Sequence, residues 1–196
     1  MKWSFLLVLL LNVNATVVLS QTHNDATTSP KALVEEYWKF ETHGERVSPG
    51  GWKSAERFLL RVAPIPAARR ITVVTDKYSV WDPWVNGKTA RVNVGVARIW
   101  GDVNEDLTFT KHSTRAIKEG VLFKLSLVDK HWETSPDGRT TEIPGPMEWR
   151  IDEPSERVWL NVEAAIGYVQ ESSKQNNDAS IKTNAERTVA KLKAMR

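Results

Sequence analysis

The chain has 196 residues, with 27 lysine and arginine residues against 24 aspartate and glutamate residues, and its formal net charge is +3. This small excess, without a strongly basic cluster, argues against a nucleic-acid-binding protein. The sequence contains no cysteine, which excludes disulfide bonds, thiolate nucleophiles and zinc–thiolate sites. A chain of this length has room for one domain with its own core.

Residues 1–20 carry the features of a secretory signal peptide. Lys2 supplies a positive charge, and Phe5–Leu11 is a continuous apolar run that is too short to span a bilayer. We expect cleavage after Ser20, and hence a secreted or periplasmic protein with no integral membrane segment after cleavage. An uncleaved N-terminal anchor is the alternative.

The rest of the chain predicts a polar leader and one folded domain. Residues 21–28 are small and polar, which is typical of a disordered leader, and residues 29–196 form the predicted domain. Ser29–Pro30 resembles a helix start, and apolar residues at helical spacing continue from it toward a stop at Gly44. Ser48–Pro49 repeats the start signal, so the domain is predicted to begin with a helical hairpin.

The middle of the chain predicts β-strands. The clearest lies at residues 90–97, where small and β-branched side chains alternate with polar ones, as in a half-buried antiparallel strand. The longest is residues 121–133, and a turn signal follows it at residues 136–138. Shorter strands are predicted at residues 71–75, 107–110, 140–143, 147–151 and 157–160.

Two helices are predicted at the C-terminal end. Asn161 and Asp178 are suitable N-cap residues, and each precedes an apolar stripe at helical spacing. The predicted fold class is therefore α+β: an N-terminal helical hairpin packed on a curved antiparallel sheet, with two C-terminal helices.

This order of elements resembles the nuclear transport factor 2-like superfamily, which includes the SnoaL-like cyclases. The resemblance rests on Leu33-Val34-x-x-Tyr37-Trp38, on Trp52–Phe58 and on the long strands, and it covers residues 30–151. It implies a cone-shaped domain with a concave sheet. The proline-rich segment between Val62 and Ile71 and the two C-terminal helices depart from that pattern.

A second resemblance concerns export alone. The segments Asp129–Glu133 and Glu148–Ile151 are similar to a group of uncharacterised exported bacterial proteins. The similarity implies export and little else.

The first candidate site is the end of the longest predicted strand. Asp129, His131 and Glu133 share the odd-numbered face of Val121–Leu127, so an apolar face becomes polar along its length. His131 between two carboxylates is a candidate general acid or base, with Asp129 as its partner and Glu133 as a ligand-binding residue. The alternative is that the strand leaves the core there and its polar groups are solvated, and a bulge would break the parity.

The second candidate site is formed by tryptophans. Trp81 and Trp84 flank Asp82-Pro83 in a predicted loop or strand end, where exposed aromatic rings can stack on sugars or other flat ligands. Trp149 is counted with the residues of a concave ligand site, although packing in the core is the alternative for it. Core positions are also predicted for Trp38, Trp52, Trp100 and Trp132.

No motif indicates a cofactor, and no histidine pair has the spacing of a helical metal site, so neither a cofactor nor a metal is predicted. The first functional hypothesis is non-catalytic binding of a small molecule or protein partner in the concave sheet. The second is a small enzyme of lyase, isomerase or hydrolase type that uses Asp129 and His131. The third is a structural or interaction protein without a pocket, and a homodimer is an open alternative.

Overall fold

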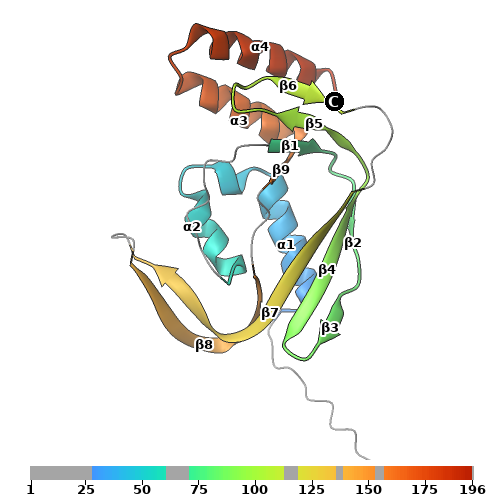
Figure 1. Cartoon of the computed structure of the whole chain (residues 1–196), viewed down its shortest axis with the longest axis vertical. Coiled ribbons are helices and arrows are strands. Elements are labelled where there is room, and N and C mark those ends of the chain that lie inside the picture. Colours follow the sequence, from blue (N-terminus) through green and yellow to red (C-terminus); the bar gives the residue numbers. More distant parts are fainter. Residues whose placement is uncertain (1–27, 61–70, 113–118, 136–138, 153–156, 196) are drawn as a thin grey trace, which may run out of the picture.

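The computed structural model describes residues 28–60, 71–112, 119–135, 139–152 and 157–195. These ranges form the predicted α+β architecture, with helices packed against a strongly curved antiparallel sheet and two helices at the C-terminal end (Figure 1). The predicted signal peptide, nearly all of the polar leader, the proline-rich segment and the turn at residues 136–138 lie outside the described residues.

Helix α1 (Pro30–Thr42) has the boundaries that its sequence predicts. The Ser29 hydroxyl accepts a hydrogen bond of 3.2 Å from the Ala32 amide, and Pro30 occupies the first turn. Gly44 follows the helix with φ of 80°, a left-handed conformation that favours glycine. The buried face of α1 includes Leu33, Val34, Tyr37, Trp38 and Phe40.

The second helix of the predicted hairpin is shorter than expected. A single 3₁₀ turn, η1 (Glu45–Val47), precedes α2 (Gly51–Ala55), and a second one, η2 (Glu56–Phe58), follows it directly. The helix starts after Gly50 rather than at Ser48–Pro49, and no side chain caps it. Trp52 is 40% exposed, so its predicted core position is wrong.

The larger sheet contains β2 (Tyr78–Val80), β3 (Trp84–Asn86), β4 (Thr89–Val96), β7 (Glu119–Thr134) and β8 (Thr140–Ile151). Its order is β2-β4-β7-β8, with β3 paired to β4 beside β2, and all its pairs are antiparallel. The predicted alternation holds in β4, where the even-numbered residues are buried, and the odd-numbered positions of β7 continue the inner face up to Leu127.

Strand β8 is continuous, although two short strands were predicted there. The Pro144-Gly145-Pro146 segment lies between the two predicted strands, and β8 passes through it. The pairing with β7 shifts register there, because Val128 faces Glu148 while Lys130 faces Pro144. The extra residues of β8 form a bulge, and bulges bend strands and increase their twist. The β7–β8 hairpin curves strongly in Figure 1.

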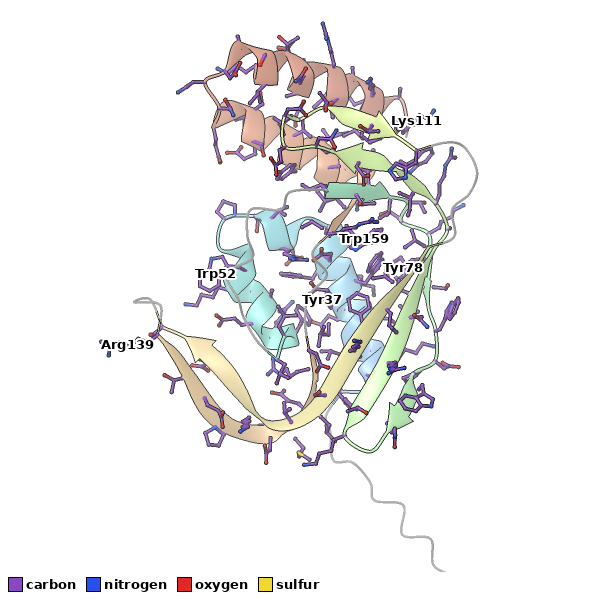
Figure 2. All side chains as sticks on the ribbon, in the orientation of Figure 1. Tyr37, Trp52, Tyr78, Lys111, Arg139 and Trp159 are labelled. Carbon is purple, nitrogen blue, oxygen red and sulfur yellow. The ribbon has the colours of Figure 1, made fainter. Side chains whose placement is uncertain are left out.

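Helix α1 packs against the inner face of this sheet. Its aromatic side chains meet those of the strands: the Tyr37 and Phe123 ring centroids lie 5.7 Å apart, and those of Trp38 and Phe123 lie 6.3 Å apart. Phe123 and Trp149 are 3% and 5% exposed. The inner face between α1 and β7 is therefore packed with side chains, as Figure 2 also shows around Tyr37.

A second sheet, which the sequence did not predict, has the order β6-β5-β1-β9. It consists of β1 (Ile71–Val74), β5 (Ile99–Val103), β6 (Phe109–Lys111) and β9 (Val158–Asn161), and the β1–β9 pair is parallel. Helices α3 (Val162–Lys174) and α4 (Ala179–Lys193) pack on it and form a second core. The predicted caps are confirmed, since Asn161 and Asp178 accept hydrogen bonds from Ala164 N and Ser180 N.

Candidate functional site

The polar end of β7 lies where the sequence placed it, beside the bulge. Asp129 and Glu133 are exposed, and the buried row of odd-numbered residues ends at Leu127. The His131 backbone pairs with Ile143, but the His131 side chain lies outside the described part of the structure. The described residues of this candidate site are thus on the surface, and proton transfer by Asp129 and His131 stays a hypothesis.

The charges around this strand end take part in surface contacts. Lys130 Nζ lies 2.7 Å from Glu142 Oε1, across the β7–β8 pair, and this contact raises the pKa of Lys130. The groove described below includes neither Asp129 nor Glu133 in its walls. Trp149, the remaining residue of the predicted concave site, is buried and pairs with Leu127. It therefore contributes to the core.

The tryptophan pair lies at the open edge of the larger sheet. Trp81 follows β2, and its amide donates a hydrogen bond of 2.9 Å to the carbonyl oxygen of Asn93 in β4. Trp84 begins β3 and pairs directly with Arg91, two residues away from Asn93. Two residues of a strand span about 7 Å, so the two tryptophans follow one another along the same edge of β4.

Both tryptophan side chains lie on the outer face of the sheet, opposite α1. On this face, Arg91, Asn93 and Gly95 alternate with the buried residues of β4. A Cβ on Gly95 would lie 3.3 Å from Trp81 Nε1, and the Arg91 guanidinium lies 5.6 Å from the Trp84 ring centroid. Trp81 and Trp84 are 56% and 57% exposed.

Local contacts hold the two rings in place. Trp81 Nε1 donates a hydrogen bond of 3.2 Å to the Ser79 hydroxyl, and Arg91 packs over Trp84 as a cation–π pair. Between the tryptophans, Asp82 forms an ion pair of 2.9 Å with Lys31 of α1, which lowers the pKa of the Asp82 carboxyl. An ion pair this exposed adds little stability, but it ties the Asp82-Pro83 connection to the helix.

The outer face continues from the tryptophans onto β7. Register places Leu122 opposite Asn93 and Lys124 opposite Arg91, and Leu122 is 49% exposed. We call the set Trp81, Trp84, Arg91, Leu122 and Lys124 the tryptophan platform. It combines flat apolar rings with two cations on a surface built from strands.

A groove that was not predicted from the sequence lies between two segments that are far apart in the chain. One wall is the α1–α2 connection and the start of α2, and the other is a face of α3, with a volume of about 650 Å³ between them. Trp52 stands on the first wall, at the periphery of the molecule in Figure 2. The groove residues of α3 and its C-cap recur at helical spacing: Ala164, Gly167, Tyr168, Glu171, Ser172 and Gln175. A glycine inside a predicted helix was the only local signal of this site.

Beside the groove, a buried ion pair between Glu41 and Arg46 joins α1 to η1, and a hydrogen bond joins Glu41 to β9. Glu41 Oε1 accepts hydrogen bonds from Arg46 Nη1 at 2.9 Å and from the Trp159 amide at 3.2 Å, and Tyr37 donates to Glu41 Oε2 at 3.1 Å. Burial raises the pKa of Glu41, and the nearby Arg46 guanidinium opposes that effect. Burial likewise raises the pKa of Tyr37 well above its usual value. Both carboxyl oxygens of Glu41 accept hydrogen bonds, and through them Glu41 connects α1 to η1 and to β9.

One oriented histidine, His112, was not predicted as a site residue. Its Nε2 lies 2.8 Å from Asp102 Oδ2, and the Thr72 hydroxyl donates to Asp102 Oδ1 at 2.7 Å. Asp102 and Thr72 are buried in the second sheet. This chain of contacts fixes the imidazole orientation, but the groove between the α1–α2 connection and α3 does not include His112 in its walls.

Within the described ranges, no group of three or more histidine or acidic side chains is placed to hold a metal ion. None of the described helices combines the length and the apolar character needed to cross a membrane. No protein-family model matches the chain, and no curated protein or solved structure matches it either.

Proposed function

We propose that the protein is a non-catalytic binding protein, and that its tryptophan platform binds an extended chain of sugar rings that carries acidic groups. The observation that supports this most strongly is the exposure of two tryptophans, by 56% and 57%, next to each other on one face of a sheet. Large exposed aromatic side chains that gather on one face mark interaction sites. The concave side, where binding was first expected, is occupied by α1.

The chemistry of the platform favours this occupant. The faces of the two indoles can stack on the apolar faces of sugar rings, because both offer flat C–H or π surfaces. Arg91 lies over the Trp84 ring and Lys124 lies opposite Arg91 on β7, so the platform carries positive charge that complements carboxylate or sulfate groups on the polymer. The strands supply a rigid support, which reduces the entropy lost on binding.

An exported protein would meet such polymers, and the signal-like residues 1–20 support a secreted or periplasmic location. Kinship with the nuclear transport factor 2-like superfamily is a further proposal. The packing of α1 against a curved sheet is compatible with it, whereas the second sheet with α3 and α4 goes beyond that pattern. Catalysis by Asp129 and His131 is the alternative function, and no described contact favours it over binding.

The test is calorimetric titration with polygalacturonate oligomers, with neutral cello-oligomers of equal length as the comparison. We expect binding of the acidic oligomer, and about a tenfold loss of affinity in Trp81→Ala and in Trp84→Ala, which corresponds to about 1.4 kcal/mol. Arg91→Gln should weaken binding and reduce its dependence on salt. The side chains are largely exposed, so these variants should fold.

Trp52→Ala is the matched control, because Trp52 is also exposed but lies on α2, away from the platform. It should leave the affinity unchanged. Equal binding by the wild-type protein and by the Trp81→Ala/Trp84→Ala double variant would refute the platform. Failure of the wild-type protein to bind either oligomer would refute the sugar partner.

A further inference from the structure

The groove between the α1–α2 connection and α3 is a candidate site apart from the tryptophan platform. Its volume of about 650 Å³ falls within the range of small-molecule sites, which span roughly 300 to 1,000 Å³. The lining is mainly apolar, with Val47, Val158 and Ala164 beside the rings of Trp52 and Tyr168. The lining also includes polar groups from the end of α3 and its C-cap: Glu171, Ser172 and Gln175.

Gly167 lines the groove on α3, and no side chain fills the groove at this position. Glycine in the middle of a helix costs about 1 kcal/mol relative to alanine, so its use there calls for a reason. Crowding within the protein is not the reason, because a Cβ built on Gly167 would meet nothing within 4 Å. The side chain that is missing from Gly167 leaves open space beside Tyr168, and this space belongs to the groove.

The charges of the groove are already paired. Arg46, which lines the groove, contacts the buried Glu41 at 2.9 Å. Glu171 contacts Lys174 at 3.2 Å and accepts a hydrogen bond from Gln175, and these contacts lower the pKa of its carboxyl. His43 Nδ1 lies 2.7 Å from the Lys39 carbonyl oxygen. The charged groups of the groove that would bind an ionic ligand already have partners within the protein. An uncharged ring needs no such partner, and its transfer out of water costs little free energy.

We infer that this groove binds a small, uncharged, flat aromatic molecule, held between Trp52 and Tyr168 and against the gap at Gly167. The apolar walls supply burial, and the indole and phenol rings supply stacking or edge contacts with the ligand ring. The site is separate from the tryptophan platform, which lies on the larger sheet. The inference therefore stands independently of the proposed sugar partner.

The experiment uses two fluorescent probes with the same type of ring system. N-phenyl-1-naphthylamine is uncharged, and 8-anilinonaphthalene-1-sulfonate carries one negative charge. We expect the uncharged probe to bind the full-length protein with a 1:1 stoichiometry, and at least about tenfold more tightly than the sulfonated probe. Equal or tighter binding of the sulfonated probe would overturn the assignment of an uncharged ligand.

Two substitutions then locate the site. Gly167→Phe places a ring in the open space and should abolish binding of the uncharged probe, and Trp52→Ala should weaken it about tenfold. Lys182→Phe adds the same ring to an exposed position of α4 outside the groove and should change nothing. Retained affinity in Gly167→Phe would overturn the inference.

Folding is checked independently. Gly167→Ala should raise the thermal midpoint, because alanine favours the helix and its Cβ meets no neighbour. It should keep most of the probe affinity, since a methyl group fills little of the groove.

Trp81→Ala and Trp84→Ala should bind the probe like the wild-type protein, so a failure of the platform and a failure of the groove are distinguishable. Probe binding lost in those two variants would assign the probe to the platform and overturn the inference.

Discussion

The contribution of the buried Glu41 carboxyl to the stability of the fold depends on pH. Desolvation raises its pKa above the ordinary value of 4.5, despite the hydrogen bonds from Arg46 and Trp159. A raised folded-state pKa means that the folded protein holds this proton more tightly than the unfolded chain does. The stability that this contributes is present below pH 4.5, and it is lost as the pH rises through the folded-state pKa.

Glu41→Gln isolates this effect, because glutamine keeps the shape and does not titrate. We expect the wild-type free energy of unfolding minus that of the variant to become smaller as the pH rises from about 4 to about 8. Urea unfolding of both proteins across this range measures the difference, in which the other titrating groups cancel. In a protein that carries Arg46→Met but keeps Glu41, the free energy of unfolding should fall more steeply with rising pH than in the wild-type protein. The substitution removes the cation that lowers the Glu41 pKa. A difference that grows with pH would show that the attraction to Arg46 outweighs burial.

At the scale of elements, the caps are the part of the fold that local sequence decides. The Asn161 side chain accepts a hydrogen bond of 2.8 Å from the Ala164 amide and so begins α3 directly at the end of β9. Asn161→Ala should lower the free energy of unfolding by about 1 kcal/mol, because one amide of the first turn loses its acceptor. The expected loss of thermal midpoint is about 2–4 °C for a chain of this size.

Asn161→Ser is the matched control for that prediction, since serine also caps helices well. It should retain most of the stability, which differential scanning calorimetry can measure. If serine destabilises as much as alanine, the loss arises from the packing of Asn161, which is buried at the end of β9, and not from the cap.

Elements whose signal is local were predicted from the sequence, whereas pairings with a distant partner were missed. Strand β4 and helix α1 carry a full pattern of alternation or helical spacing, and both were found nearly to the residue. Strands β2 and β3 have three residues each, too few to show a period. The parallel pairing of Ile71 with Val158 joins segments far apart in the chain, and no local pattern reveals it.

The same distinction applies to the candidate sites. Trp81 and Trp84 could be found, because the Asp82-Pro83 pair marks a break in an edge strand. Trp52 was misplaced, since its helical spacing suggests a buried position although α2 is only one short turn. The groove joins residues 43–52 to residues 164–175, so only the folded chain brings its two walls together.

At the scale of the whole molecule, two hydrophobic cores share their strands. Strand β1 contributes Val74 to the core under α1, and Ile71 and Val73 to the core under α3 and α4. Strand β9 does the same, since Trp159 faces the first core and Leu160 the second. Separation of the cores would expose both faces of β1 and β9 and leave Glu41 without the Trp159 amide.

We therefore expect both cores to unfold in one transition. Leu192→Ala removes a fully buried side chain from the second core, where large-to-small changes cost about 2–5 kcal/mol. It should lower the urea midpoint equally by tryptophan fluorescence, dominated by the first core, and by far-ultraviolet circular dichroism, which also reports α3 and α4. Lys182→Ala on the exposed side of α4 should leave both midpoints in place. Separate midpoints for the two signals would mean that the shared strands do not couple the cores, because the second core would then melt while Trp38, Trp149 and Trp159 stay buried.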